Sequence, residues 1–283
     1  MRHNRDTAAA GPGSGGGTIG AMITRHRPLL VLTGLLALPV AACSAPSAGT
    51  DASERPDRAD ASAAPDASAS ELSTVLLLGD SIALGQAQPL DAAFEAGGVD
   101  FRSLASAGGG NVVGPTSEER WETLPGQIAS AEPDAVIYQI TTYDWGGERE
   151  QRDAYERLLT TVTEADARLV FVTMPPIRPD DFYEPHMEEL DRAPDVARAV
   201  VGDAPEHAVV LDAGEVWGET YQREHEGAVD RSSDGIHTCP QGAARFTSWL
   251  LAELTALYPD FSPPAAEEWA NTGWSASEQF TGC

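Results

Sequence analysis

Three residues far apart in the chain have the types and spacing needed for nucleophilic catalysis. Ser81 lies three residues after the end of an apolar run at 74–78, while Asp234 and His237 lie close together toward the end of the chain. A histidine can take the proton of a serine hydroxyl, and a carboxylate then fixes the tautomer of that histidine and stabilises its imidazolium form. We therefore predict Ser81 as the nucleophile, His237 as the general base and Asp234 as the orienting acid.

Each part of this pattern has a simpler interpretation when taken alone. A Gly-Asp-Ser sequence such as residues 79–81 is more often the N-cap of a helix, and a histidine is usually a surface or packed core residue. Ser81, however, is expected to open a helix directly after a strand, where the helix N-terminus stabilises an oxyanion. Because Asp234 and His237 supply the acid and the base from one loop, the combination favours catalysis.

The elements that must position these residues follow from the apolar runs. Continuous apolar runs that end in glycine or polar residues are typical of strands covered on both faces. We expect strands at 74–78, 99–104, 135–140, 169–174 and 208–211, and helices at 82–96, 118–131, 148–165, 185–201 and 241–257. This alternation predicts an α/β protein, a three-layer α/β/α sandwich with a five-stranded parallel sheet. Its reactive groups should lie at the carboxyl ends of the strands.

Three sequence blocks carry a resemblance to a known family. The sequence GDSIALG at 79–85, a glycine-bearing loop at 107–111 and Asp-x-x-His before the last helix resemble the SGNH/GDSL hydrolase superfamily, over about residues 73–257. The resemblance implies a flavodoxin-like fold and the triad already named. It also implies an oxyanion hole made by the backbone N–H of Ser81, by that of a glycine within 108–110, which we place at Gly110, and by an asparagine amide from a third block.

The third block departs from the family pattern. Where the family has Gly-x-Asn-Asp, this chain has Thr141, Thr142, Tyr143 and Asp144, so the asparagine amide is missing. Losing one donor of an oxyanion hole can lower the rate on the order of 10²-fold. Thr141 or Thr142 could supply a donor instead, and Asn111 is a further candidate that could equally be a turn residue. The same departure resembles SGNH domains that accompany membrane O-acyltransferases of cell-surface polysaccharides.

The N-terminal region is typical of an exported protein. Residues 1–42 predict a signal peptide, because two arginines precede an apolar run at 29–40 and small residues follow it. Residues 40–43 also resemble the bacterial lipobox, which implies a lipid on Cys43; an ordinary secretory cleavage is the alternative. We then expect residues 43–72 to form the lipidated cysteine and a disordered Ala/Ser/Asp/Pro linker. Residues 73–283 are expected to form the hydrolase domain with its C-terminal tail. We expect a lipoprotein anchored to the outer face of the cell membrane.

Two cysteines remain once Cys43 is assigned to the lipid. In an oxidising exterior an even pair is typically bonded, so we predict a disulfide between Cys239 and Cys283, beside His237. The alternatives are two free thiols, or a zinc site that includes His237, although this spacing matches no familiar ligand pattern. We expect neither a metal nor a cofactor.

Charge and motifs together narrow the function. With 44 acidic and 18 basic residues, the net charge of −26 excludes nucleic acid as a partner. We expect a monomeric serine esterase that hydrolyses small acyl esters, above all O-acetyl groups, of extracellular carbohydrate or cell-envelope glycan. An O-acyltransferase with the same triad and a non-catalytic glycan-binding lipoprotein stay open. Tyr143, Asp144 and Trp145 either line a sugar pocket or simply pack.

Overall fold

The computed structural model describes residues 71–283 of the chain. The predicted signal peptide, the lipid site at Cys43 and the linker as far as residue 70 lie outside these described residues. Leu72, predicted as the end of the linker, is buried in the core, so the packed region begins before residue 73. Within residues 71–283, no helix is long and apolar enough to cross a membrane.

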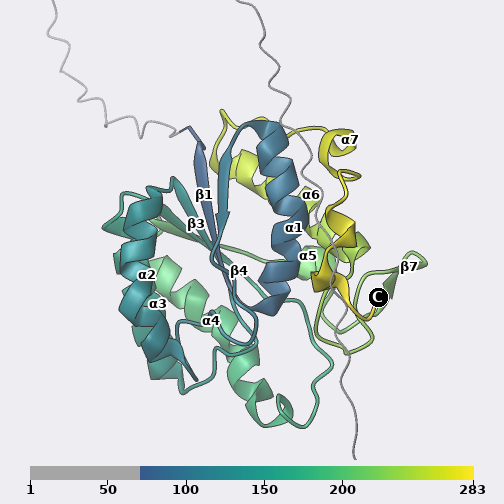
Figure 1. Cartoon of the computed structure of the whole chain (residues 1–283). Coiled ribbons are helices and arrows are strands. Elements are labelled where there is room, and N and C mark those ends of the chain that lie inside the picture. The colour runs from purple at the N-terminus through teal and green to yellow at the C-terminus, as the bar shows by residue number, and fades with distance from the viewer. Residues whose placement is uncertain (1–70) are drawn as a thin grey trace, which may run out of the picture. The chain divides into compact units, whose positions relative to one another are not determined.

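Five parallel strands form the central sheet, in the order β2-β1-β3-β4-β5 (Figure 1). They are β1 (Thr74–Leu78), β2 (Asp100–Ser103), β3 (Ala135–Gln139), β4 (Arg168–Val172) and β5 (Ala208–Leu211). The prediction of a five-stranded parallel sheet is therefore confirmed. Because the chain leaves β1 toward β2 and returns on the other side as β3, the loops that follow β1 and β3 diverge. Such a switch point opens a crevice at the carboxyl edge of the sheet.

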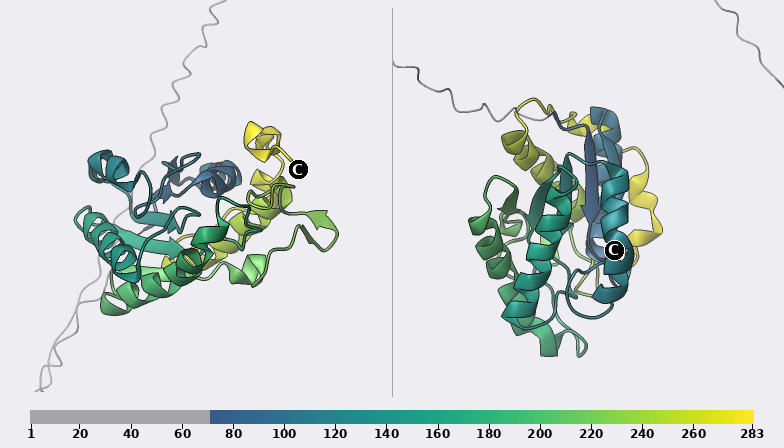
Figure 2. Two further views of the ribbon diagram at one scale, coloured as in Figure 1. Left: turned by 90° about the horizontal axis from the view of Figure 1, so that it is seen from below. Right: turned by 90° about the vertical axis from the view of Figure 1, so that its left-hand side faces the viewer.

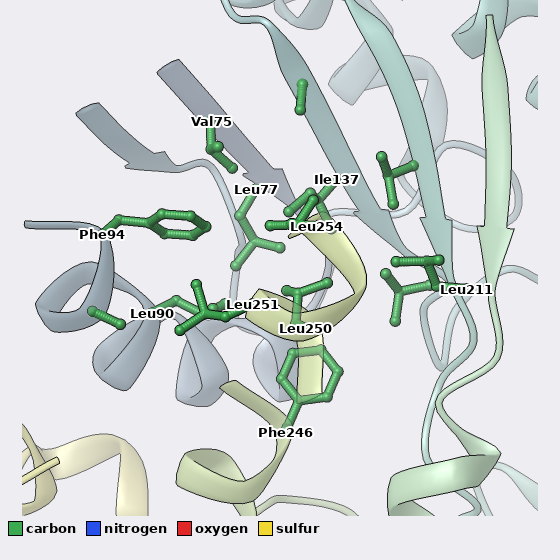
Figure 3. Close-up of a cluster of buried hydrophobic side chains, with 14 of the residues drawn as sticks. Val75, Leu77, Leu90, Phe94, Ile137, Leu211, Phe246, Leu250, Leu251 and Leu254 are labelled. Atoms are coloured by element: carbon green, nitrogen blue, oxygen red, sulfur yellow. The ribbon is translucent and has the colours of Figure 1, made fainter. Parts of the chain in front are cut away.

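Alternate side chains of β1, β3, β4 and β5 enter two separate cores, one on each face of the sheet, whereas the edge strand β2 is mostly exposed. Val75 and Leu77 face α1 (Ser81–Gly97) and α6 (Pro240–Leu257), in the core drawn in Figure 3. Leu76 and Leu78 face the other core, which α2 (Ser117–Ala131), α3 (Glu148–Thr163) and α4 (Met187–Asp203) complete. The two groups of helices lie on opposite sides of the sheet (Figures 1 and 2), which confirms the predicted sandwich.

The short elements differ most from the sequence expectation. The fourth predicted helix begins at Met187 rather than at Pro185, because residues 184–186 form a 3-10 turn, η1 (Glu184–His186), ahead of it. The sequence pattern also misses α5 (Gly214–Trp217), β6 (Glu224–His225), β7 (Ala228–Val229), α7 (Ala266–Trp269), η2 (Trp274–Ala276) and η3 (Glu278–Phe280). Elements of two to four residues are too short for a hydrophobic period to show.

The segment after α6 returns along α1, where both views of Figure 2 place it. Phe261 and Trp269 join the core under α1, and Phe280 is buried further along the same helix. The tail thereby reaches the carboxyl edge of the sheet, where the predicted catalytic residues lie.

Candidate active site

Ser81 lies at the tight turn between β1 and α1. Gly79 permits this turn, since its φ is +151° and a Cβ there would lie 2.6 Å from the Cβ of Ala83. Asp80 then caps the helix, its Oδ1 accepting a hydrogen bond from the backbone N–H of Ile82 at 2.9 Å. Ser81 is therefore the first residue of α1, at the positive end of the helix dipole.

The buried carboxylate of Asp80 links the ends of two strands. Its Oδ2 accepts hydrogen bonds from the backbone N–H and the hydroxyl of Thr142, at 2.8 and 2.7 Å, in the loop after β3. Burial raises the pKa of Asp80, and the hydrogen bonds from Thr142 and Ile82 oppose that rise. Asp80 is thus more than a helix cap, because it also holds the loop after β3 beside the serine.

The structure brings the three predicted triad residues together. His237 Nε2 lies 2.8 Å from Ser81 Oγ, and His237 Nδ1 lies 2.8 Å from Asp234 Oδ2. Asp234 Oδ1 accepts the backbone N–H groups of Ile236 and His237, at 2.7 and 3.0 Å. Burial alone would raise the pKa of Asp234, but these hydrogen bonds lower it to about 2. The carboxylate is therefore ionised at neutral pH and can orient the imidazole.

A buried arginine shapes the loop that carries Asp234 and His237. Arg231 is 1% exposed and donates to the carbonyl oxygens of Pro176 and Ile236, at 2.8 and 2.7 Å. Burial lowers the pKa of Arg231 to about 10, so its guanidinium stays charged at neutral pH. Sequence reasoning missed this residue, because an arginine in an acidic loop is ordinarily a solvated residue.

The C-terminal tail is tied to the same loop. Cys239 and Cys283 are joined by a disulfide, as predicted. The backbone N–H of Ser233 also donates to the carbonyl oxygen of Gly282 at 3.0 Å. The zinc alternative is wrong, since both thiols are used in the disulfide and His237 Nε2 faces Ser81. Elsewhere in residues 71–283, no three His, Cys, Asp or Glu side chains gather as metal ligands would.

The glycine loop after β2 lies directly against the nucleophile's turn. Gly110 has φ +84°, and a Cβ there would lie 2.0 Å from the carbonyl oxygen of Gly79. Only a glycine allows so close a backbone contact. Among the hydrogen bonds of the described residues, none is donated by the backbone N–H of Ser81 or of Gly110. The fold therefore uses neither N–H group, which leaves both as candidate donors to an oxyanion.

The other two expected oxyanion donors are used elsewhere, which corrects both expectations. Asn111 donates both amide hydrogens to the carbonyl oxygens of Val113 and Pro115, at 2.6 and 2.7 Å. It is therefore a turn residue, the alternative that its sequence context left open. Thr141 donates its backbone N–H and its hydroxyl to the carboxylate of Asp144, at 3.3 and 3.0 Å. Neither side chain has a donor left for a substrate.

Asp144 organises the loop that lacks the family's asparagine. Its buried carboxylate also accepts the hydroxyls of Tyr138 and Tyr155, at 2.7 and 2.9 Å. Burial raises the pKa of Asp144 to about 7, although the hydrogen bonds from both tyrosines and from Thr141 lower it. Asp144 thus belongs to the core and lines no sugar pocket.

The next residues of this loop form an aromatic cluster. Tyr143 packs against Trp145, with ring centroids 5.7 Å apart, and both contact Phe182 from the loop after β4. Tyr183 joins them, its hydroxyl 3.5 Å from that of Tyr143. Burial raises the pKa of Tyr183, so this hydroxyl is protonated at neutral pH. Sequence reasoning missed Phe182 and Tyr183, which follow a different strand from Tyr143.

Comparison with known proteins finds similar folds among solved structures. No protein-family model matches the chain, and no curated protein matches it. A solved structure from Bacteroides ovatus, described as a GDSL-like lipase, is 15% identical with a TM-score of 0.50; the match covers 69% of this chain and 56% of that one.

Two further solved structures are similar at lower scores. An SGNH hydrolase by description, from Slackia heliotrinireducens, is 19% identical with a TM-score of 0.48, covering 65% of this chain and 98% of that one. A catalytic mutant of an acetylxylan esterase from Geobacillus stearothermophilus is 13% identical with a TM-score of 0.49, covering 65% and 94%. With its strand order and its likeness to the solved GDSL-like structure, the chain has the fold of the SGNH/GDSL hydrolases.

Proposed function

We propose that this protein is a serine esterase of the SGNH/GDSL superfamily that hydrolyses small acyl esters, above all O-acetyl esters of extracellular carbohydrate or cell-envelope glycan. The observation that carries the proposal is the continuous hydrogen-bonded series from Asp234 through His237 to Ser81, at the N-terminus of a helix. Nothing in the packing of residues 71–283 requires such a series, whereas nucleophilic catalysis does.

The chemistry follows from this geometry. His237 Nε2 takes the proton of Ser81 as Oγ attacks the ester carbonyl carbon, and Asp234 stabilises the imidazolium. The backbone N–H groups of Ser81 and Gly110 bind the oxyanion. The intermediate collapses as His237 protonates the leaving alcohol, which leaves an acyl group on Ser81. Water, deprotonated by His237, then attacks the acyl carbonyl carbon. As the bond from that carbon to Ser81 Oγ breaks, His237 returns the proton to Oγ and the carboxylic acid leaves.

The oxyanion hole of this enzyme has two backbone donors and lacks the usual amide. A missing donor raises the barrier by about 3 kcal/mol, so we expect a slow esterase. The same feature favours the second candidate, a glycan-binding protein without activity. Reaction with a fluorophosphonate probe separates the two, because only a nucleophilic Ser81 is labelled.

The decisive experiment compares wild type with Ser81→Ala. We expect wild type to release p-nitrophenol from p-nitrophenyl acetate and acetate from acetylated oligosaccharides, and to be labelled by the fluorophosphonate, while Ser81→Ala does neither. An O-acyltransferase would instead form acylated sugar only when a sugar acceptor is added. Equal activity of the two proteins, or no labelling of either, would refute the esterase.

The site of action is proposed from the N-terminal sequence alone. We propose that Cys43 carries a lipid that holds the domain outside the cell membrane, with the residues from 44 up to the buried Leu72 as a tether. Mass spectrometry of the mature protein should find a lipidated N-terminal cysteine, and Cys43→Ala should move the protein from the membrane fraction to the medium. Unchanged membrane association of Cys43→Ala would refute the anchor.

A further inference from the structure

A hollow of about 630 Å³, which no triad residue lines, lies at the loops that follow β2 and β3. It opens between the loops after β2 and β3 and the first turns of α2 and α3, and its lining includes Val112, Gly114, Trp121, Trp145, Glu150 and His186. Its volume is within the range of ligand pockets, roughly 300–1,000 Å³. The catalytic mechanism uses none of these residues.

The aromatic side chains of the hollow are held in fixed positions. The indole N–H of Trp145 donates to the carbonyl oxygen of Thr142 at 2.9 Å. His186 stacks on Trp145, with ring centroids 3.6 Å apart and planes 4° apart, and its Nδ1 lies 3.0 Å from Glu189 Oε2. Trp121 donates to the carbonyl oxygen of Val112 at 2.8 Å. Rings that are already fixed lose little entropy when a ligand packs on them.

The floor of the hollow is formed by two loops in close contact. Gly114, with φ +85°, lies against the loop after β3, because a Cβ there would lie 2.4 Å from the carbonyl oxygen of Tyr143. Arg192 of α4 donates to the carbonyl oxygen of Gly146 at 2.7 Å and to Gln151 Oε1 at 3.1 Å. The loop is thus held from both sides, so the hollow is part of the packed fold.

The polar groups of the hollow are mostly carboxylates. Glu118, Glu150, Asp153 and Glu189 line it, and the one arginine in the lining, Arg157, already packs over the ring of Trp121 at 4.0 Å. Carboxylates accept hydrogen bonds from hydroxyl and ammonium groups and repel anions. Aromatic faces beside such acceptors suit a sugar ring, whose C–H groups pack on the rings while its hydroxyls reach the carboxylates.

The hollow connects with the triad through Trp145. This side chain lines the hollow and also packs against a buried cluster that includes Ile82 and Ile236. Ile82 follows Ser81 in the chain, and Ile236 precedes His237. Phe182, which contacts Trp145, is 53% exposed and extends the aromatic surface. A polymer with one unit in the hollow could therefore present the next units to Ser81.

We propose that this hollow binds a sugar unit of the glycan substrate, neutral or amine-bearing but not anionic, and so selects esters carried on such chains. The inference rests on the proposed function for its link to catalysis, whereas binding itself can be measured without turnover. The stacked pair of Trp145 and His186 supplies an apolar surface with the ring sides that do not face each other, and the carboxylates around the pair bind the hydroxyls or the amine.

Binding is tested with Ser81→Ala protein, which cannot turn over its ligand. Isothermal titration should detect xylohexaose, which is neutral, and a chitosan hexamer, which bears amines, but not a hexamer of galacturonate. Adding Trp145→Ala should weaken the first two by about tenfold or more, as expected for a lost aromatic contact. The matched control is Trp249→Ala, on the opposite face of the sheet, which should bind as the parent does. Equal binding of galacturonate, or full binding by the Trp145→Ala protein, would overturn the proposal.

Kinetics then separate this inference from the proposed function. In the active enzyme, Trp145→Ala should raise KM for acetylated xylo-oligosaccharides several-fold more than KM for p-nitrophenyl acetate. If both KM values rise equally while Ser81→Ala remains inactive, the sugar site is wrong and the esterase stands. If Ser81→Ala protein binds the oligosaccharides but wild type hydrolyses no ester, the sugar site stands and the esterase is wrong.

Discussion

Removing the disulfide between Cys239 and Cys283 should destabilise both the fold and the active site. The bond joins residues that are 44 positions apart. For a loop of this length, the chain-entropy relation gives about 4 kcal/mol of stabilisation at 25 °C. The same bond holds the tail against the loop of His237, where Ser233 donates to the carbonyl oxygen of Gly282. Cys283→Ser should therefore lower the free energy of unfolding by up to about 4 kcal/mol and also lower kcat.

The assay combines urea unfolding with hydrolysis of p-nitrophenyl acetate. Treatment of wild type with dithiothreitol should bring its urea midpoint and its kcat close to those of Cys283→Ser. The same treatment should leave both values of the variant unchanged. A loss of less than about 1 kcal/mol, well below the usual cost of removing a disulfide, would refute the reasoning if kcat were also unchanged. The tail would then hold its position through Phe280, Trp269 and the hydrogen bond from Ser233 to Gly282.

Three further predictions test the site. Asp234→Asn should lower kcat on the order of 10³- to 10⁴-fold, because an amide beside Nδ1 favours the wrong imidazole tautomer. The control is Asp212→Asn, which changes an exposed carboxylate that binds Arg198 and should leave kcat unchanged. Equal losses of kcat in the two variants would contradict the triad. Gly110→Ala should lower kcat about 100-fold or more, since the new Cβ would overlap the carbonyl oxygen of Gly79. The variant is checked by circular dichroism for folding and by ester hydrolysis for activity. A folded and fully active variant would exclude Gly110 from the oxyanion hole. Asp144 has a folded-state pKa of about 7, above its unfolded value, so its contribution to stability is complete below about pH 4 and is lost as pH rises through 7. When the pH is raised from 5 to 8, the urea midpoint of wild type should decrease, and that of Asp144→Asn should decrease less. Parallel profiles of the two proteins would contradict the raised pKa of Asp144.

The strands and the triad could be predicted because each has a local sequence signal. Strands β1, β3, β4 and β5 are mostly apolar, whereas β2 (Asp100–Ser103) has only Phe101 as an apolar residue. Ser81 follows the first of these strands, and His237 lies shortly before α6. Parallel α/β topology then brings the carboxyl ends of the strands to one edge, which is why residues at the two ends of the domain meet.

The supporting residues could not be predicted, because their roles depend on loop conformation. Arg231 binds carbonyl oxygens of two loops, and nothing in its neighbours indicates burial. The amide of Asn111 binds acceptors two and four residues ahead, a local turn that the sequence does not distinguish from an active-site donor. Phe182 and His186 reach Trp145 from another strand's loop, so only the fold places them together.

The contact between Gly79 and Gly110 has a consequence for how this site can change during evolution. Two backbone segments touch there without any side chain between them, so the alignment of the two N–H donors does not depend on the residues of the loop after β3. In that loop Thr142 binds Asp80 and Asp144 binds Tyr138 and Tyr155, whereas Tyr143 and Trp145 are partly exposed and take no part in this buried network. Under the proposed function, substitutions at Tyr143 or Trp145 would therefore change the surroundings of Ser81 while the contact between Gly79 and Gly110 stays in place.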